Sequence, residues 1–257
     1  MATAMITGGT SGIGYAFARE LAERGTDLVL VARDEERLAR IAAEFHETFG
    51  VEVRTHRADL AVREDVDRIA RVIEDPANPL DLFINNAGFG LHSTVLDPAH
   101  IDQHARALDV MCLAVLILGG AAGRAMRARG HGRIINVASS ASAIFTGNYS
   151  AVKAWVHNYS ESLGVELRGT GVTVTALRPG WVRTEFHERA GIKAHNLPDL
   201  VWIDIDTLVR EGLADAEKGK PVSVPSWKWK AALLVAKLAP TGFLRWFSRK
   251  LVASRKK

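Results

Sequence analysis

Tyr149 and Lys153 stand four positions apart in the segment NYSAVKAW, so a helix would place them on one face. A free phenol has a pKa of about 10, and a neighbouring ammonium lowers that pKa by stabilising the phenolate. The pair therefore predicts a tyrosine that gives a proton to a carbonyl oxygen or takes it back. Ser139, in the segment NVASS, would hold the same oxygen by a hydrogen bond. The alternative is an exposed helical pair and a turn-forming serine.

A glycine-rich turn, TGGTSGIG, carries Gly8, Gly12 and Gly14 between a predicted strand and a predicted helix. Glycines at this place let the backbone approach a pyrophosphate, which the helix N-terminus then stabilises. The spacing is TGxxxGxG and not GxGxxG, and a glycine-rich turn can also be a purely structural connection. The turn predicts a dinucleotide site only together with the other groups described below.

Arg33 ends the second predicted strand, about twenty residues after the glycines, where a dinucleotide site reads the ribose. Its planar guanidinium suits a 2′-phosphate, whereas an acid would accept hydrogen bonds from a free 2′-hydroxyl. Asp34 could supply that acid, but it directly precedes a helical segment and is better explained as its N-cap. The sequence therefore favours NADP(H) over NAD(H).

Two further segments follow predicted strands. NNAG, with Asn85, Ala87 and Gly88, provides small and amide residues that suit a backbone passing close to the adenosine ribose, although its asparagines could equally form a turn. Asp59, followed by Leu60, could cap the next helix or contact the adenine, and both roles stay open. No metal site is expected.

Short apolar segments alternate with longer segments of helical period along most of the chain. Strands that are continuously apolar and separated by helices indicate a parallel sheet covered on both faces. We therefore predict an α/β fold, a single Rossmann-type doubly wound domain over residues 1–225. Long helices are expected near 101–129 and 149–168, a loop over 185–199, and a basic amphipathic tail over 226–257.

The composition, 47% hydrophobic and 24% charged, is that of an ordinary globular protein and excludes a disordered chain. Cys112 is the lone cysteine, and the start of the chain carries no secretory pattern, so a cytoplasmic location is expected. The net charge of +4 is uneven, because eleven Lys or Arg and no acid follow Glu217. A nucleic-acid partner is not expected, since no recognition motif accompanies the basic residues.

Together these segments resemble the short-chain dehydrogenases/reductases, NAD(P)-dependent oxidoreductases on one Rossmann-type domain, and the resemblance extends to about Val224. It makes Ser139, rather than Ser140 or Ser142, the catalytic serine with Tyr149 and Lys153. It implies carbonyl–alcohol interconversion and a homodimer or homotetramer paired through the two long helices. It also implies that the cofactor is bound by Gly8, Thr10, Ser11, Gly12, Ile13, Gly14, Arg33, Asp59, Leu60, Asn85, Ala87, Gly88, Tyr149, Lys153, Pro179, Gly180, Val182 and Thr184.

Two features depart from that family's pattern. The interval between Ser139 and Tyr149 is short, which narrows one wall of the substrate pocket. Met111 stands where many members have an asparagine in a water-linked proton path to the lysine, and a thioether cannot replace an amide donor. The leading function is an NADPH-dependent carbonyl reductase or alcohol dehydrogenase, and the alternative is a non-catalytic NADP-binding sensor or scaffold.

The tail raises a separate question. Phe243, Phe247 and Leu251 recur every four residues, with Arg249 and Lys250 on other faces, as in an interfacial amphipathic helix. Contact of residues 241–257 with a membrane surface would favour a lipid-like substrate, ketoacyl or steroid-like. Packing of the same face on the domain or on a partner subunit is the alternative.

Overall fold

The computed structural model describes residues 2–91, 93–183 and 201–254. Within them a seven-stranded sheet has the strand order β3-β2-β1-β4-β5-β6-β9, and every pairing is parallel. The order reverses between β1 and β4, which is the switch point where ligands bind in doubly wound folds. The strands of this sheet are β1 Thr3–Thr7, β2 Asp27–Ala32, β3 Val53–Arg57, β4 Leu82–Asn85, β5 Gly132–Val137, β6 Val172–Leu177 and β9 Val222–Ser223.

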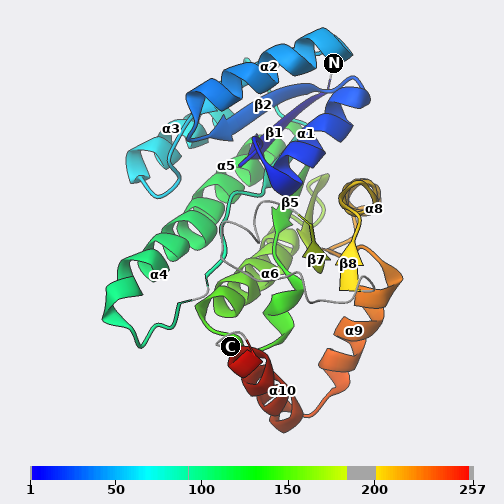
Figure 1. The fold of residues 1–257 in the computed structure, drawn as a ribbon. Coiled ribbons are helices and arrows are strands. Elements are labelled where there is room, and N and C mark those ends of the chain that lie inside the picture. Colours follow the sequence, from blue (N-terminus) through cyan, green and yellow to red (C-terminus); the bar gives the residue numbers. More distant parts are fainter. Residues whose placement is uncertain (1, 92, 184–200, 255–257) are drawn as a thin grey trace.

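Helices cover both faces of the sheet (Figure 1). One layer consists of α1 Gly12–Glu23, α2 Glu35–Phe49 and α8 Ile205–Glu217. The other consists of α3 Arg63–Glu74, α4 Ile101–Leu108, α5 Ala114–Arg129 and α6 Asn148–Glu166. Each layer has its own buried apolar cluster, with Phe17 and Ile6 in the first and Phe83 and Met5 in the second. The predicted Rossmann-type fold is confirmed.

Local sequence explains where several helices begin and end. The carboxylate of Asp34 accepts a hydrogen bond from the backbone N–H of Arg37 at 2.9 Å, so Asp34 is the N-cap of α2, as predicted. Gly50 then ends α2 in the left-handed conformation, with φ of 70°. Because α2 is capped at Asp34, Arg33 stands in the short turn between β2 and α2.

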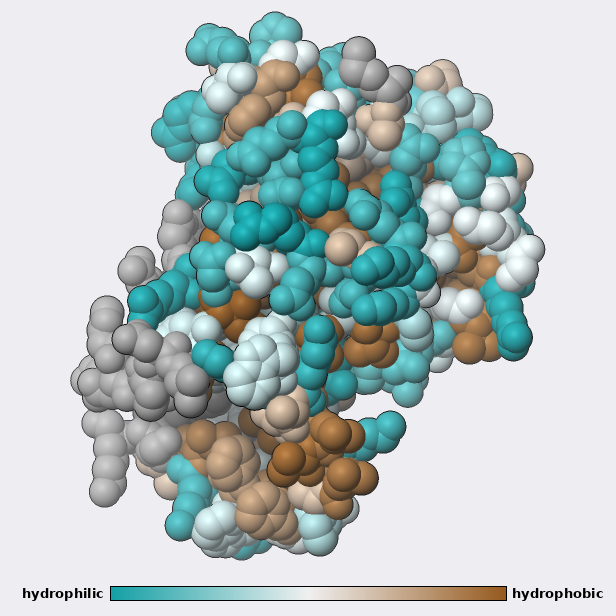
Figure 2. Space-filling view, turned by 90° about the vertical axis from the view of Figure 1, so that its right-hand side faces the viewer, coloured by the Kyte–Doolittle hydropathy of each residue, from teal (hydrophilic) through white to brown (hydrophobic). Residues whose placement is uncertain are grey.

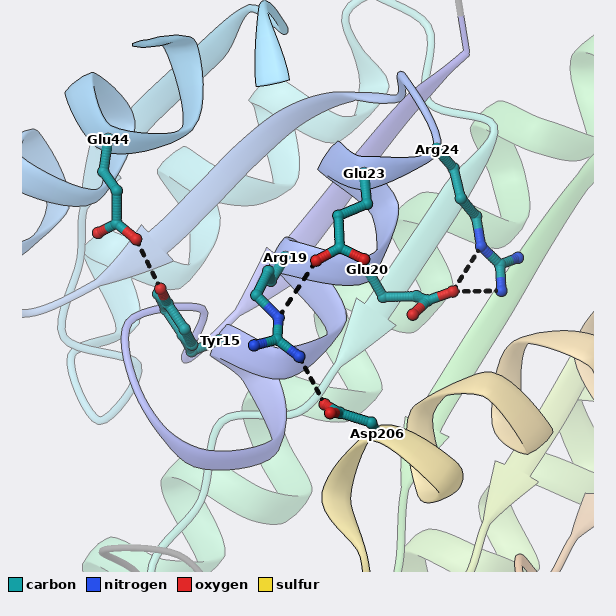
Figure 3. Close-up of polar contacts among 7 residues, drawn as sticks. All are labelled: Tyr15, Arg19, Glu20, Glu23, Arg24, Glu44 and Asp206. Atoms are coloured by element: carbon teal, nitrogen blue, oxygen red, sulfur yellow. Dashed lines mark hydrogen bonds and ion pairs between the residues drawn. The ribbon is translucent and has the colours of Figure 1, made fainter. Parts of the chain in front are cut away.

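Polar contacts attach α1, the helix that follows the glycine turn, to its neighbours (Figure 3). The hydroxyl of Tyr15 donates to Glu44 of α2 at 2.8 Å, and Arg19 pairs with Asp206 of α8 at 2.7 Å. Exposed pairs of this kind contribute about 0–1 kcal/mol each, so the apolar layer and not these contacts provides most of the stability. Their effect is to orient α1 relative to the helices beside it.

The predicted helix over residues 101–129 is present but is not uniform. A π-helical turn, Asp109–Leu113, separates α4 from α5 and contains Met111. The stretch Pro98–Arg129 is long and apolar enough to cross a membrane by length and composition, yet half of its most apolar window is buried in the fold. It is therefore a core helix of the second layer. A π-turn inside a helix frequently lies at a functional site.

The C-terminal helix pair, residues 227–254, consists of α9 Trp227–Leu238 and α10 Thr241–Ser254. It follows β9 and extends below the sheet, near the end of the chain (Figure 1). Two short strands, β7 Trp181–Val182 and β8 Trp202–Ile203, pair beside it, and the 3-10 turns Pro98–His100 and Ser140–Ala143 complete the described elements. The expected loop over 185–199 lies outside the described residues.

Candidate active site

A cavity of about 1350 Å³ lies at the carboxyl edge of the sheet. Residues that directly follow β1, β2, β3, β4 and β5, and Pro179 shortly after β6, contribute to its lining, as expected of a site in a doubly wound fold. Further lining comes from α4, from α6 and from the C-terminal helix pair. The cavity therefore joins the polar edge of the sheet to an apolar cover formed by that helix pair.

The glycine turn is held in a single conformation by Asn86. The side-chain amide of Asn86 donates to the carbonyl of Thr7 at 2.9 Å and to that of Gly8 at 3.3 Å, and the Thr7 hydroxyl accepts from the backbone N–H of Asn86 at 3.0 Å. A Cβ on Gly14 would lie 2.2 Å from the Gly8 carbonyl oxygen, and Gly8 has a φ of 67°. Only glycine fits at either position.

The N-terminus of α1 borders this cavity. Its N-cap residue, Ser11, makes no side-chain hydrogen bond to the turn, and Thr10, Ser11, Gly12 and Ile13 all line the cavity. An uncapped helix N-terminus beside a glycine turn fits the pyrophosphate of a dinucleotide, because both the N–H groups and the helix dipole favour negative charge.

Two arginines stand where the adenosine end of a dinucleotide would lie. Arg33 is exposed and lines the cavity, and Arg37, one turn further on in α2, lines it as well. Asp59 pairs with Arg106 at 2.7 Å and accepts from the backbone N–H of Ala61 at 3.0 Å. Although burial alone would raise it, these hydrogen bonds hold the pKa of Asp59 below its usual value.

The helix-capping interpretation of Asp59 is wrong. Helix α3 begins at Arg63 after Val62, which provides no side-chain cap. The carboxylate of Asp59 instead accepts hydrogen bonds from the backbone N–H of Ala61 and from the guanidinium of Arg106. Asp59 therefore shapes the cavity wall and does not cap the helix.

Ser139, Tyr149 and Lys153 meet on one side of the cavity. Ser139 follows β5 in extended conformation, and its hydroxyl accepts from the backbone N–H of Ala141 at 3.1 Å. Tyr149 is the second residue of α6, and a hydrogen bond joins its hydroxyl to the Ser139 side chain. The ammonium of Lys153 is buried, donates to the carbonyl of Val137 at 2.7 Å, and lies 6.0 Å from the centre of the Tyr149 ring.

The expectation that Lys153 brings the pKa of Tyr149 down is wrong for the chain as described. Burial raises the pKa of Tyr149 to about 12, and the hydrogen bond with Ser139 opposes only part of that shift. Burial also lowers the pKa of Lys153, to about 8. Both shifts have one main cause, because burial disfavours the charged form of each group, the phenolate of Tyr149 and the ammonium of Lys153.

The arrangement suits the delivery of a proton to a carbonyl oxygen. A phenol with a raised pKa stays protonated at neutral pH, so Tyr149 is ready to donate, while Ser139 provides a second hydrogen bond to the same oxygen. When bound, the nicotinamide supplies the hydride for the carbonyl carbon. The ammonium of Lys153 lies near the Tyr149 ring, which becomes negatively charged once the hydroxyl has given its proton to the substrate.

Most residues predicted to bind the cofactor line this cavity, namely Gly8, Thr10, Ser11, Gly12, Ile13, Arg33, Asp59, Leu60, Ala87, Gly88, Tyr149, Lys153, Pro179, Gly180 and Val182. Gly14 and Asn85 do not line it. Gly14 packs against Gly8, and the amide of Asn85 is buried behind the edge and donates to Asn136 at 3.0 Å. Thr184 lies outside the described residues.

Sequence reasoning missed several lining residues. The asparagine of NNAG that reaches the cavity is Asn86, not Asn85, and only the register of β4 distinguishes them. Arg37 could have been found from its place in the first turn of the helix that Asp34 caps, close in sequence to Arg33. Trp229 of α9 had no such signal: its indole covers Gly180, where a Cβ would lie 2.1 Å from the ring, and its N–H donates to the carbonyl of Val201 at 3.0 Å.

Comparison with known proteins agrees with the fold. The short chain dehydrogenase family matches residues 2–194, and the chain belongs to that family. It is therefore an oxidoreductase. An uncharacterized oxidoreductase of Staphylococcus epidermidis is 33% identical over 207 residues, covering 77% of this chain and 88% of that protein.

Two solved structures are also similar. A short-chain dehydrogenase from Sphingobium yanoikuyae in complex with NADPH is 33% identical, with a TM-score of 0.82, over 90% of this chain and 92% of that one. The bulky-bulky ketone specific alcohol dehydrogenase from Comamonas testosteroni is 28% identical, with a TM-score of 0.78, over 92% of each chain.

Proposed function

We propose that the protein is an NADPH-dependent carbonyl reductase whose substrates are large, largely apolar ketones. The observation that carries the proposal is the cavity itself, which has Ser139, Tyr149 and Lys153 on one side and an apolar wall on the other. That wall contains Leu233 and Phe247 of the C-terminal helix pair. The polar groups would fix the carbonyl, and the apolar wall would receive the rest of the molecule.

The preference for NADPH is supported by Arg33, which directly follows β2, and by Arg37 in the first turn of α2, since both line the cavity. Asp34, the acid that could have favoured NAD(H), also lines the cavity, but one of its carboxylate oxygens accepts the capping hydrogen bond of α2. The similar Sphingobium protein was solved with NADPH.

A large substrate is supported by the volume of the cavity and by its composition. A cavity of about 1350 Å³ exceeds the range of roughly 300–1,000 Å³ typical of small-molecule pockets, as expected for one that receives both a dinucleotide and a substrate. The similar Comamonas enzyme is described as specific for bulky-bulky ketones.

The test is to measure NADPH consumption with a graded panel that includes short dialkyl ketones, bulky diaryl ketones, steroid ketones, long-chain keto esters, keto sugars and acyl thioesters. The proposal expects turnover with the bulky apolar ketones and little with the sugars. Tight NADPH binding without turnover on any member would instead favour the cofactor-sensing alternative, for which the replacement at Met111 is the motivating feature.

The cofactor preference has its own test. Arg33→Ala should weaken NADPH binding about 10- to 150-fold, the range of a charge-assisted hydrogen bond of roughly 1.5–3 kcal/mol, and should leave NADH binding nearly unchanged. Arg40→Ala is the matched control, because Arg40 is an exposed arginine of the adjoining helix α2 and does not line the cavity. Equal losses for both cofactors in the Arg33 variant would contradict the proposal.

A homo-oligomer is part of the same proposal. Ile101, Leu108, Leu113 and Leu116, on the helical stretch 101–129, are large apolar side chains exposed on the described surface. A line of such residues on a long helix suits the expected pairing of subunits. Light scattering after size exclusion tests it, with a monomeric mass as the contrary result.

A further inference from the structure

Helix α9 is apolar on two opposite faces, yet none of its twelve residues, all within the described chain, is buried. Its inner face contributes Trp229, Leu233 and Ala236 to the cavity. Its outer face carries Trp227, Ala231, Leu234 and Leu238 at spacings of four, three and four residues. A helix that is apolar all round is normally buried in a protein core or in a membrane.

The outer face is strongly exposed: Trp227, Leu234 and Leu238 have exposed fractions of 73%, 58% and 75%. Figure 2 shows hydrophobic residues gathered at the lower end of the molecule, over the C-terminal helix pair. Single exposed apolar residues need no explanation, but a continuous stripe along a helix indicates an interaction surface.

Lysines border this stripe on both sides. At 100° per residue, Lys230 and Lys237 lie along one edge of it and Lys228 along the other. Lys230 makes one exposed contact of 3.5 Å with Glu211. The sequence contains no acid after Glu217, so nothing in this segment repels an anionic surface.

Helix α10 continues the same surface to the mouth of the cavity. Trp246 is half exposed, and the ammonium of Lys250 lies 4.3 Å from the centre of its ring. Phe243 and Phe247 line the cavity and are also partly exposed, so they border its opening. The buried hydroxyl of Ser248 accepts from the backbone N–H of Phe145 at 3.0 Å, which fixes α10 beside the turn that follows Ser139.

These positions correct the sequence-based membrane hypothesis. It directed Phe243, Phe247 and Leu251 towards a bilayer, but all three line the cavity. The face left for another surface is the outer stripe of α9 with Trp246.

We propose that the protein docks on an anionic lipid surface through the outer face of α9 and through Trp246, and that its ketone substrate enters the cavity from that surface. The stripe would lie at the acyl boundary and the lysines at the headgroups. With twelve residues, α9 is too short to span a bilayer, which needs about twenty. The entry of substrate rests on the proposed reductase function; the docking does not.

A second copy of the chain fits this face less well. A two-fold pair places identical surfaces against each other, so the lysines along the stripe would meet their own counterparts across the contact. An anionic lipid surface instead provides opposite charge at both edges of the stripe. Charge complementarity therefore favours the lipid surface.

The test is co-sedimentation of the full chain with vesicles of phosphatidylcholine alone or with about a third phosphatidylglycerol, at low and at high salt. The proposal expects binding to the anionic vesicles that falls at high salt, and at least tenfold weaker partitioning for Leu234→Ser/Leu238→Ser. Val165→Ser is the matched control, since Val165 is an equally exposed valine (74%) on α6, away from this face. Lys228→Gln/Lys237→Gln should weaken binding to the anionic vesicles and reduce its salt dependence.

Two results would overturn the proposal. One is the absence of vesicle binding by the full chain at low salt. The other is a change in molecular mass, without a change in vesicle binding, for the Leu234/Leu238 variant, which would assign the face to a second copy. Because sedimentation involves no turnover, either result leaves the reductase proposal standing, and failure of the ketone panel leaves the docking result standing.

Discussion

Around the glycine turn the cavity wall is fixed by hydrogen bonds and by contacts too close for a Cβ, whereas around α9 it consists of partly exposed apolar side chains. On the first side, Asn86 bonds two carbonyls and Gly14 touches the backbone of Gly8. On the second, no residue of α9 is buried. The wall around the glycine turn therefore suits a single ligand geometry, and the wall formed by α9 can adapt to several.

Tyr149 lines the cavity beside Ser139 and Lys153, and its replacement should have the largest effect on turnover. Tyr149→Phe removes the hydroxyl that donates the proton but keeps the ring, so ketone reduction should fall about 10²–10⁴-fold. NADPH affinity, a property of the fixed wall, should stay within a few-fold. Steady-state rates and fluorescence titration of NADPH measure the two quantities. More than about a tenth of the normal rate would show that another group donates the proton.

The raised pKa of Tyr149, about 12, predicts different pH profiles for the two directions. Alcohol oxidation needs the phenolate, so its rate should rise about tenfold per pH unit across the alkaline range. Ketone reduction needs the neutral phenol, so its rate should stay level from neutral pH through the alkaline range and fall only as the pH approaches about 12. Rate profiles in both directions measure this. An oxidation rate that levels off near neutrality would mean that the phenol is acidic in the working enzyme.

Gly14→Ala tests the fixed wall directly. The new methyl group would lie 2.2 Å from the Gly8 carbonyl oxygen, so the backbone must move, at about 1–3 kcal/mol of unfolding free energy. We expect a melting temperature lower by roughly 2–4 °C per kcal/mol, together with weaker NADPH binding. In the control, Gly164→Ala in α6, the methyl group lies 3.7 Å from its nearest neighbour, and stability should be unchanged or higher. Equal behaviour of the two variants would mean that the turn is not tightly packed.

Leu233→Ala tests the adaptable wall. Leu233 lines the cavity from a helix without buried residues, so its truncation should change the melting temperature little. The lost apolar contact, roughly 1–2 kcal/mol, should raise KM about 5- to 30-fold for bulky ketones and much less for small ones. Thermal unfolding and KM for a large and a small ketone provide the comparison. A loss of stability as large as that of Gly14→Ala would show that the two walls do not differ.

The difference between the wall around the glycine turn and the wall formed by α9 and α10 also explains which parts of the site the sequence predicted. The parallel sheet followed from apolar segments of strand length, and the glycine turn, Arg33, Ser139, Tyr149 and Lys153 followed from fixed spacings next to strand ends. The fixed wall is built from backbone, so its requirements appear as glycines and short motifs. The wall formed by α9 and α10 depends on how two amphipathic helices fold back on the domain, which no local pattern in residues 227–254 specifies. Burial reversed the expected pKa shift of Tyr149 for a related reason, because desolvation depends on the whole surrounding structure.

The smallest expected effect concerns Met111, a buried residue behind Gly88 of the cavity lining. Its side chain is fully buried in the π-helical turn, and a Cβ on Gly88 would lie 3.0 Å from its sulfur. The thioether offers no amide donor for a water that would resupply a proton to Lys153, whose ammonium already donates to the Val137 carbonyl. Met111→Asn should therefore raise the single-turnover rate of ketone reduction by roughly two- to tenfold, less than the contribution of a complete general acid.

Measurements in H₂O and D₂O make the Met111 test specific, because faster proton delivery should reduce the solvent isotope effect. Met111→Leu is the control, since it keeps the apolar volume without adding an amide, and its rate should match that of the natural chain. The buried amide will cost some stability unless it finds partners, so both variants should be compared well below their melting temperatures. An unchanged rate and isotope effect in a folded Met111→Asn variant would show that backbone carbonyls of the π-turn already support the proton path. The replacement at Met111 would then be a packing feature of the fixed wall and not a limit on turnover.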